Sequence, residues 1–198
     1  MTAPPVSPFT GQRILVVGLA REGGVAAQWL AERGAQIIIS DLRTAEALAE
    51  PLTSLDPFGV ELRLGPQTPD LLTDIDAIVV SPGVPQDIPL LASARLNHIP
   101  ITSETRLFAQ HCPAPIVGIT GSSGKTTTTT LTAKMLEHAS FTTWLGGNIG
   151  DPLLGRLPEI HQDHKVVMEL SSFQLLTWSE QHDTPADNLP WHDSRGIS

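Results

Sequence analysis

The sequence predicts an α/β protein: a Rossmann-like parallel-sheet N-terminal domain followed by a partial P-loop ATPase α/β domain. The first reason is that short apolar segments alternate with segments of helical spacing, which is typical of a parallel sheet with crossover helices. The second is that glycine-rich turns follow two of the apolar segments, at residues 18–23 and 118–124. The chain has 198 residues and is 40% hydrophobic, so it can bury a core.

The first part of the chain contains the segments expected to build one sheet and its helices. Apolar runs predict strands at residues 13–17, 36–40, 60–64 and 77–80. Helical spacing predicts helices at residues 25–33, 44–49, 88–97 and 103–111. Ser103 suits the N-cap of the last helix because its hydroxyl can accept from a free backbone N–H, and Glu104 suits its first turn.

A domain boundary is predicted where prolines interrupt this pattern. Pro113 and Pro115 lack an amide donor and bias their predecessors toward extended backbone, so the preceding helix ends there. We therefore expect residues 1–112 to form the first domain and residues 113–178 to form part of a second. In the second we expect strands at residues 114–119, 142–145 and 165–170 and a helix at residues 126–138.

Residues 179–198 have a different character, with prolines, scattered Asp and His, and no apolar period. We expect them to form a disordered or unrelated tail. The alternative, a metal site, is less favoured because no regular element would fix its ligands. The candidate ligands would be His182, Asp183, His192 and Asp193.

Composition excludes several classes of function. The formal net charge of −9 disfavours nucleic acid and acidic membranes as partners. No apolar run approaches the ~20 residues that span a bilayer, and residues 1–10 do not resemble a signal peptide, so a cytoplasmic protein is expected. The single cysteine, Cys112, excludes an internal disulfide and a cysteine-based zinc site.

The most informative segment is GITGSSGKTT, at residues 118–127. It joins a predicted strand to a predicted helix, where free N–H groups and the helix dipole favour an anion. Lys125 can reach the outer phosphates of a nucleotide, and the Thr126 hydroxyl can bind Mg2+. The spacing is shorter than that of the common P-loop, and the alternative is a glycine turn followed by a chance lysine. The candidate phosphate-binding residues are Thr120, Gly121, Ser122, Ser123, Gly124, Lys125, Thr126 and Thr127.

A second glycine turn, GLAREG at residues 18–23, stands where a Rossmann fingerprint would be found, but Ala20 replaces the middle glycine. Asp41 ends the next strand, where a carboxylate can accept from ribose hydroxyls or a base N–H, and Arg43 is close by. A nicotinamide cofactor, another nucleotide and a purely structural turn all remain open from these residues alone. The SPGV turn at residues 81–84 is expected at the same sheet edge, where α/β folds bind ligands, and the alternative is an ordinary Pro-Gly turn.

Three further strings complete a pattern that resembles the Mur ligase family of peptidoglycan synthesis. They are SPGV at residues 81–84, GGNIG at residues 146–150 and ELSSFQL at residues 169–175, in the family's order around the phosphate loop. The last two are similar to the branch that adds D-glutamate. The resemblance covers residues 12–176.

That resemblance implies ATP-dependent ligation of D-glutamate to UDP-N-acetylmuramoyl-L-alanine through an acyl phosphate, with Mg2+. It implies catalytic roles for Lys125, Glu169 and Asn148, and a metal site formed by Thr126 and Glu169. It also implies contacts between the UDP-substrate and Leu19, Arg21, Glu22, Asp41, Arg43, Ser81, Gly83, Asn148, Ser171 and Gln174.

The sequence also departs from the family. Arg21 and Glu22 are not the small or apolar residues expected beside a diphosphate, and Ser123 replaces an asparagine. The second metal's lysine and the D-glutamate domain are absent, so we expect a truncated chain with an exposed sheet edge that favours self-association. The alternative function is a non-catalytic fragment that binds UDP-sugar and nucleotide. An NAD-linked oxidoreductase is disfavoured by Ala20.

Overall fold

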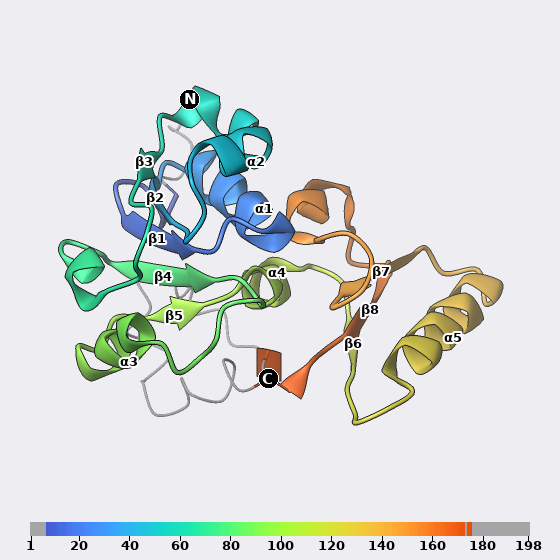
Figure 1. The fold of residues 1–198 in the computed structure, drawn as a ribbon. Helices are drawn as coiled ribbons and strands as arrows, with labels where there is room; N and C mark the ends of the chain where they lie inside the picture. The colour runs from blue at the N-terminus through green and yellow to red at the C-terminus, as the bar shows by residue number, and fades with distance from the viewer. Residues whose placement is uncertain (1–6, 173, 176–198) are drawn as a thin grey trace, which may run out of the picture.

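The computed structural model describes residues 7–172, 174 and 175, and these residues form two parallel sheets (Figure 1). The first sheet is built by strands between residues 13 and 102, and the second by strands between residues 116 and 169. The expected α/β class with parallel sheets is confirmed. The boundary expected at residues 112–113 remains a prediction, and residues 179–198 lie outside the described part of the chain.

The first sheet has the strand order β3-β2-β1-β4-β5, and all its paired strands are parallel. Its interior strands are nearly continuous apolar runs because a parallel sheet is covered on both faces. The bounds are β1 (Arg13–Val17), β2 (Gln36–Ser40), β3 (Glu61–Leu62), β4 (Ala77–Val80) and β5 (Ile101–Thr102).

Alternate residues of β1 point into two different apolar clusters, as the period of a strand requires. Ile14 and Val16 join a cluster with residues of α1 (Arg21–Ala31) and α4 (Glu104–His111). Leu15 and Val17 join a second cluster with residues of α3 (Pro89–Leu96). The remaining elements are α2 (Ala49–Thr53) and the 3-10 helices η1 (Glu46–Leu48), η2 (Asp56–Phe58) and η3 (Pro69–Leu72).

The second sheet has the order β6-β8-β7, again parallel, with β8 in the centre. Its strands are β6 (Ile116–Ile119), β7 (Thr143–Gly147) and β8 (Lys165–Glu169), and its helices are α5 (Lys125–His138) and the 3-10 helix η4 (Leu154–Glu159). Val166 and Met168 of β8 belong to the same apolar cluster as Ile14 and Val16 of β1, so one core extends from the first sheet into the second.

Several expected boundaries were wrong. The first helix begins at Arg21 rather than residue 25, because Gly23 packs against the turn after β1 as part of the helix. The segment at residues 44–49 is not one helix: η1 and α2 replace it, and Pro51 lies inside α2. The strand expected at residues 60–64 is limited to Glu61 and Leu62, both exposed at the sheet edge. Neither β5 nor η4 was expected.

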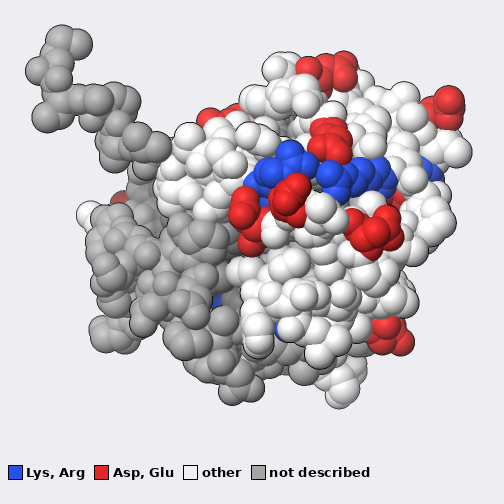
Figure 2. Space-filling model, turned by 90° about the vertical axis from the view of Figure 1, so that its left-hand side faces the viewer, with Lys and Arg blue, Asp and Glu red and all other residues white. Residues whose placement is uncertain are grey.

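None of the described helices is long and apolar enough to cross a membrane. Basic side chains form a short band bordered by acidic ones on the side of the molecule at the left of Figure 1 (Figure 2). Glu61 forms ion pairs with the guanidinium groups of Arg13 and Arg63.

Candidate functional site

The glycine-rich loop after β6 leads directly into α5, the longest of the described helices. Gly124 is the residue before the helix and has a φ of 73°, a left-handed conformation that glycine adopts without strain. The ammonium group of Lys125 donates to the carbonyl of Gly121 at 2.8 Å, so this side chain folds back over the loop. The predicted phosphate-binding residues 120–127 therefore combine a glycine turn, the N-terminus of α5 and the ammonium group of Lys125.

Three side chains from separate segments meet at the carboxyl ends of the second sheet. The hydroxyl of Thr126 donates to Oε2 of Glu169 at 2.7 Å, and Nδ2 of Asn148 lies 3.3 Å from Oε1 of the same carboxylate. Glu169 ends the central strand and is only 3% exposed, so its carboxylate is buried at this edge of the sheet. The backbone N–H of Asn148 also donates to the carbonyl of Glu169 at 2.8 Å.

Parallel register explains why these residues converge. Glu169 is paired with Ile119 of β6 on one side and with Gly147 of β7 on the other. The loop that leads to Thr126 in α5 and the loop that carries Asn148 therefore begin on the two sides of Glu169. A side chain at Gly147 would not fit, because its Cβ would lie 2.2 Å from the carbonyl of Glu169.

This donor set fits Mg2+. A threonine hydroxyl and a carboxylate are hard oxygen donors, and Mg2+ commonly takes one or two of these from the protein and the rest from phosphates and water. The described residues contain no group of three or more His, Cys, Asp and Glu side chains that could hold a metal, and Mg2+ in such a site does not need one.

Ser171 and Gln174 form a reciprocal hydrogen-bonded pair after β8. The N–H of Ser171 donates to Oε1 of Gln174 at 2.8 Å, and the N–H of Gln174 donates to Oγ of Ser171 at 3.1 Å. This is the arrangement of a capping box, which the spacing S-x-x-Q can form. Gln174 is 5% exposed, and its Nε2 donates to Oγ1 of Thr105 at 3.1 Å.

At the carboxyl edge of the first sheet, Asp41 is surrounded by hydrogen-bond donors. Oδ2 accepts from the N–H of Leu19 and from Nη2 of Arg43, each at 2.8 Å, and Oδ1 accepts from Nε of Arg43 at 2.9 Å. The hydrogen bonds from the Arg43 side chain lower the pKa of Asp41 to about 2. The carboxylate therefore holds the turn after β1 and the segment after β2 together.

The turns after β1 and β4 are in direct contact. Oγ of Ser81 donates to the carbonyl of Gly18 at 2.5 Å. A Cβ at Gly23 would lie 2.2 Å from that carbonyl and 2.6 Å from Oγ of Ser81, so the first helix can approach the turn only with glycine there. Gly83 is exposed, with open space where a Cβ would stand.

Arg21 and Glu22 open α1 at the side nearest the second sheet. Arg21 lies 3.7 Å from a carboxylate oxygen of Glu22 and 3.7 Å from one of Asp151, which follows β7. A groove of about 490 Å³ begins here and runs along α1, with Arg21, Val25, Gln28, Asp151, Pro152 and Arg156 among its walls. Lys125, Asn148 and Glu169 are not part of this groove.

The burial of Glu104 could not be predicted from the sequence. This residue is 5% exposed, and its Oε1 accepts from the N–H of Leu154 at 2.9 Å. Burial raises the pKa of Glu104 to about 7, the Leu154 N–H opposes this shift, and the nearby charge of Glu22 adds to it. A carboxylate in the first turn of a helix is normally exposed and interacts with the free N–H groups there. Glu104 differs because its hydrogen-bond partner, Leu154, lies 50 residues further along the chain.

Two family models match the chain: Mur ligase MurD-like, N-terminal domain, at residues 12–103, and Mur ligase middle domain, at residues 119–184. A protein of Geobacter sp. (strain M21) named UDP-N-acetylmuramoylalanine--D-glutamate ligase is 45% identical over 164 residues, which is 83% of this chain and 36% of that protein. A protein of the same name from Clostridium novyi (strain NT) is 40% identical over 170 residues, 86% of this chain and 37% of that protein.

The chain thus spans little more than a third of the length of these relatives. Among solved structures, a pseudomurein peptide ligase type C from Methanothermus fervidus matches with a TM-score of 0.45 and 27% identity. That match covers 82% of this chain and 33% of the other.

Proposed function

Because this chain belongs to the Mur ligase family, we propose that it forms the part of a D-glutamate ligase that binds the UDP-substrate and ATP. The reaction would join D-glutamate to UDP-N-acetylmuramoyl-L-alanine, with cleavage of ATP. The observation that carries the proposal is the junction of Thr126, Asn148 and Glu169 beside the phosphate loop. It joins a nucleotide loop to a carboxylate and an amide from the neighbouring strands.

The proposed chemistry requires activation of a carboxylate. An oxygen of the alanyl carboxylate attacks the γ-phosphorus of ATP, the bond to the bridging oxygen breaks, and ADP leaves. The amine of D-glutamate then attacks the acyl phosphate, the amide forms, and inorganic phosphate leaves while the amine gives up a proton. No protein nucleophile takes part, so the contribution of the chain is positioning and charge neutralisation.

Lys125 and the loop amides would neutralise charge on the phosphates. In the structure Lys125 donates to Gly121, and this contact would be exchanged for phosphate oxygens when the nucleotide binds. Thr126 and Glu169 would hold Mg2+, which supplies further neutralisation of the transferring group. Asn148, fixed by its contacts with Glu169, would orient the muramoyl-alanine end of the substrate.

At the first sheet, Leu19, Asp41 and Arg43 would hold the uridine end, with Ser81 and Gly83 at the second turn of the same edge. Arg43 is half exposed at its side chain, so its guanidinium can contact a ligand while it remains paired with Asp41. Arg21 and Glu22 would lie on the side of the diphosphate that faces the second sheet.

Titration calorimetry tests this proposal. The chain should bind Mg-ATP and UDP-N-acetylmuramoyl-L-alanine, and Lys125→Ala should weaken Mg-ATP binding at least tenfold while UDP-sugar binding is retained. Lys134→Ala, on the exposed side of the same helix, is the matched control. Equal ATP affinity in the two variants would refute the role of the loop.

Phosphate release separates the ligase from the alternative. Release that depends on D-glutamate identifies a competent ligase, and binding of both ligands without release identifies a non-catalytic binding fragment. Binding of NADH without affinity for the UDP-sugar would exclude both.

A further inference from the structure

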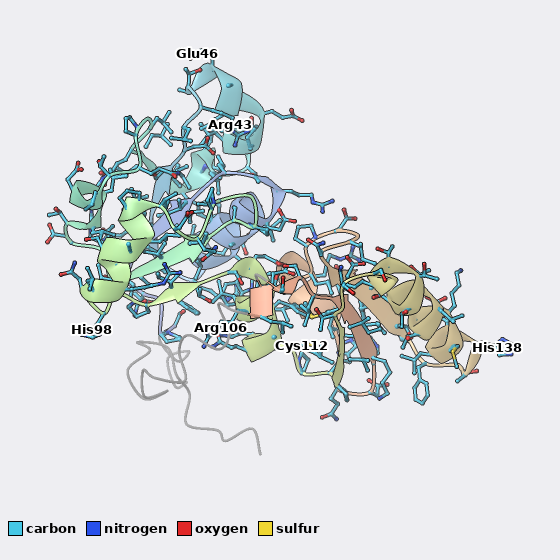
Figure 3. All side chains as sticks on the ribbon, turned by 60° about the horizontal axis from the view of Figure 1, so that its bottom comes forward. Arg43, Glu46, His98, Arg106, Cys112 and His138 are labelled. Atoms are coloured by element: carbon cyan, nitrogen blue, oxygen red, sulfur yellow. The ribbon has the colours of Figure 1, made fainter. Side chains whose placement is uncertain are left out.

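The first turn of α4 makes contacts with the loops that follow two strands of the second sheet. Figure 3 shows that α4, which carries Arg106 and ends next to Cys112, lies between the two parts of the molecule. Its first residues, Glu104 and Thr105, are separated from β5 of the first sheet only by the N-cap Ser103, and both are buried.

Glu104 holds the loop after β7. Its Oε1 accepts from the N–H of Leu154, the first residue of η4, at 2.9 Å. This segment leads on from Asn148 and Asp151, so its position determines how the chain leaves the carboxyl end of β7.

Thr105 holds the loop after β8. Its Oγ1 accepts from Nε2 of Gln174 at 3.1 Å, while Oε1 of the same amide accepts from the N–H of Ser171. The side chains of Gln174 and Ser171 are thus engaged with protein partners, and Gln174 is too deeply buried to present a wide surface to a ligand. Its position depends on Thr105, a residue of the other sheet's helix.

Resting on the proposed function, we propose that Glu104 and Thr105 are positioning residues that set the muramoyl-alanine end of the UDP-substrate relative to the ATP phosphates. The first sheet would hold the uridine end, and the loops after β7 and β8 would meet the other end. Two adjacent residues of one rigid helix fix both loops to the first sheet. The distance between the uridine site and these loops is therefore set before a substrate that spans the two sheets binds. Gln174 acts in this arrangement through Ser171 rather than by touching substrate.

The test uses Thr105→Val, which keeps the shape of the side chain and removes the hydroxyl, and Thr105→Ser, which keeps the hydroxyl. The matched control is Thr73→Val, because the exposed Thr73 hydroxyl donates only to Asp70 within its own turn. Calorimetry is done with three ligands: UDP, UDP-N-acetylmuramoyl-L-alanine and Mg-ATP. Circular dichroism verifies that each variant is folded.

We expect Thr105→Val to weaken binding of UDP-N-acetylmuramoyl-L-alanine about tenfold, since it removes the hydroxyl that accepts from the buried amide of Gln174. Affinities for UDP and for Mg-ATP should stay within about twofold, because each of these ligands contacts only one sheet. Thr105→Ser should retain the wild-type affinities. The proposal is overturned by unchanged UDP-N-acetylmuramoyl-L-alanine affinity in Thr105→Val, or by an equal loss in Thr105→Ser.

Hydrogen exchange without ligand separates this inference from the proposed function. The amide of Ser171, which donates to Gln174, should exchange about tenfold faster in Thr105→Val and at the wild-type rate in Thr73→Val. If the wild-type chain binds UDP-N-acetylmuramoyl-L-alanine no more tightly than UDP, the proposed function fails. Unchanged exchange at Ser171 contradicts the positioning of its loop by Thr105, whatever the chain binds.

Discussion

The hydroxyl of Thr126 lies 2.7 Å from Oε2 of Glu169, although 43 residues separate them in the chain. Thr126 lies in the first turn of the helix after the phosphate loop, and Glu169 ends the central strand of the same sheet. A helix N-terminus and a buried carboxylate are thereby brought to one point, with Asn148 on the other carboxylate oxygen. The metal dependence of nucleotide binding should therefore be sensitive to the charge at residue 169.

Glu169→Gln should reduce the effect of Mg2+ on ATP affinity. The substitution keeps the shape and an oxygen acceptor for Thr126 but removes the negative charge that a divalent cation requires. Wild-type protein should bind ATP at least tenfold more tightly with Mg2+ than with EDTA, and the variant should show a much smaller ratio in calorimetry. Glu137→Gln, on the exposed side of α5, should behave as wild type. An undiminished Mg2+ effect in Glu169→Gln would contradict the assignment.

The adjacent residues Gly23 and Gly24 should respond in opposite directions to alanine. A Cβ at Gly23 would lie 2.2 Å from the carbonyl of Gly18, whereas a Cβ at Gly24 would meet nothing within 4 Å. Gly23→Ala should therefore lower the free energy of unfolding by about 2 kcal/mol or more, through displacement of the turn against Ser81. Gly24→Ala should raise it by roughly 0.5–1 kcal/mol because alanine favours the helix. Urea unfolding compares the two, and equal effects would contradict the predicted contact.

Features that depend on a local sequence pattern could be predicted, whereas contacts between distant segments, such as that of Gly23 with Ser81, could not. The turn at residues 18–23 and the phosphate loop could be predicted because each follows a strong apolar pattern, and parallel strands bring their carboxyl ends to one edge. The role of Glu169 was predicted only from the resemblance that ELSSFQL carries. Glu104 and Thr105 were not identified as part of the site, because their partners Leu154 and Gln174 are 50 and 69 residues away. The periodicity of apolar residues predicts which face of a helix or strand is buried. It does not predict which distant residue will form a hydrogen bond with a polar side chain of that element. For the same reason the two-residue strand β5 gave no periodic signal.

Asp41→Asn should destabilise the fold at neutral pH and weaken UDP binding. The variant loses the charge that Arg43 pairs with and one acceptor needed by the N–H of Leu19 or by Arg43. Hydrogen bonds to a charged group of this kind contribute about 1.5–3 kcal/mol, and the exposure of Arg43 places the expected loss near the lower end. Glu50→Gln, on the exposed side of α2, is the control for removal of a surface carboxylate.

The Asp41 contribution has a defined pH dependence. Its pKa is lowered from 3.8 to about 2 in the folded chain, so its stabilisation is fully present above about pH 4 and is lost as pH falls toward 2. The difference in stability between wild type and Asp41→Asn should therefore narrow in that acid range. A difference that stays constant down to about pH 2 would show that the charge of Asp41 is not its source.

Glu104 should make the folded chain less stable as pH rises from about 4.5 to about 7. Its pKa is 4.5 as a free side chain and about 7 in the folded protein, where burial disfavours the charged form. Between these values the folded chain binds the proton that the unfolded chain has released, so the free energy of unfolding decreases with rising pH. The penalty is complete above pH 7 and, at about 1.4 kcal/mol for each pKa unit, is on the order of 3 kcal/mol.

Glu104→Gln removes this titration while it keeps an oxygen that can accept from the N–H of Leu154. In urea unfolding at about pH 5, 6 and 7.5, the stability of the wild type relative to that of Glu104→Gln should decrease across the series. Glu137→Gln should follow the wild type, because that side chain is exposed. Asp41 does not interfere, since its own transition lies below about pH 4. Parallel curves for wild type and Glu104→Gln would mean that Glu104 is ionised at low cost in the fold, which would contradict the burial that raises its pKa.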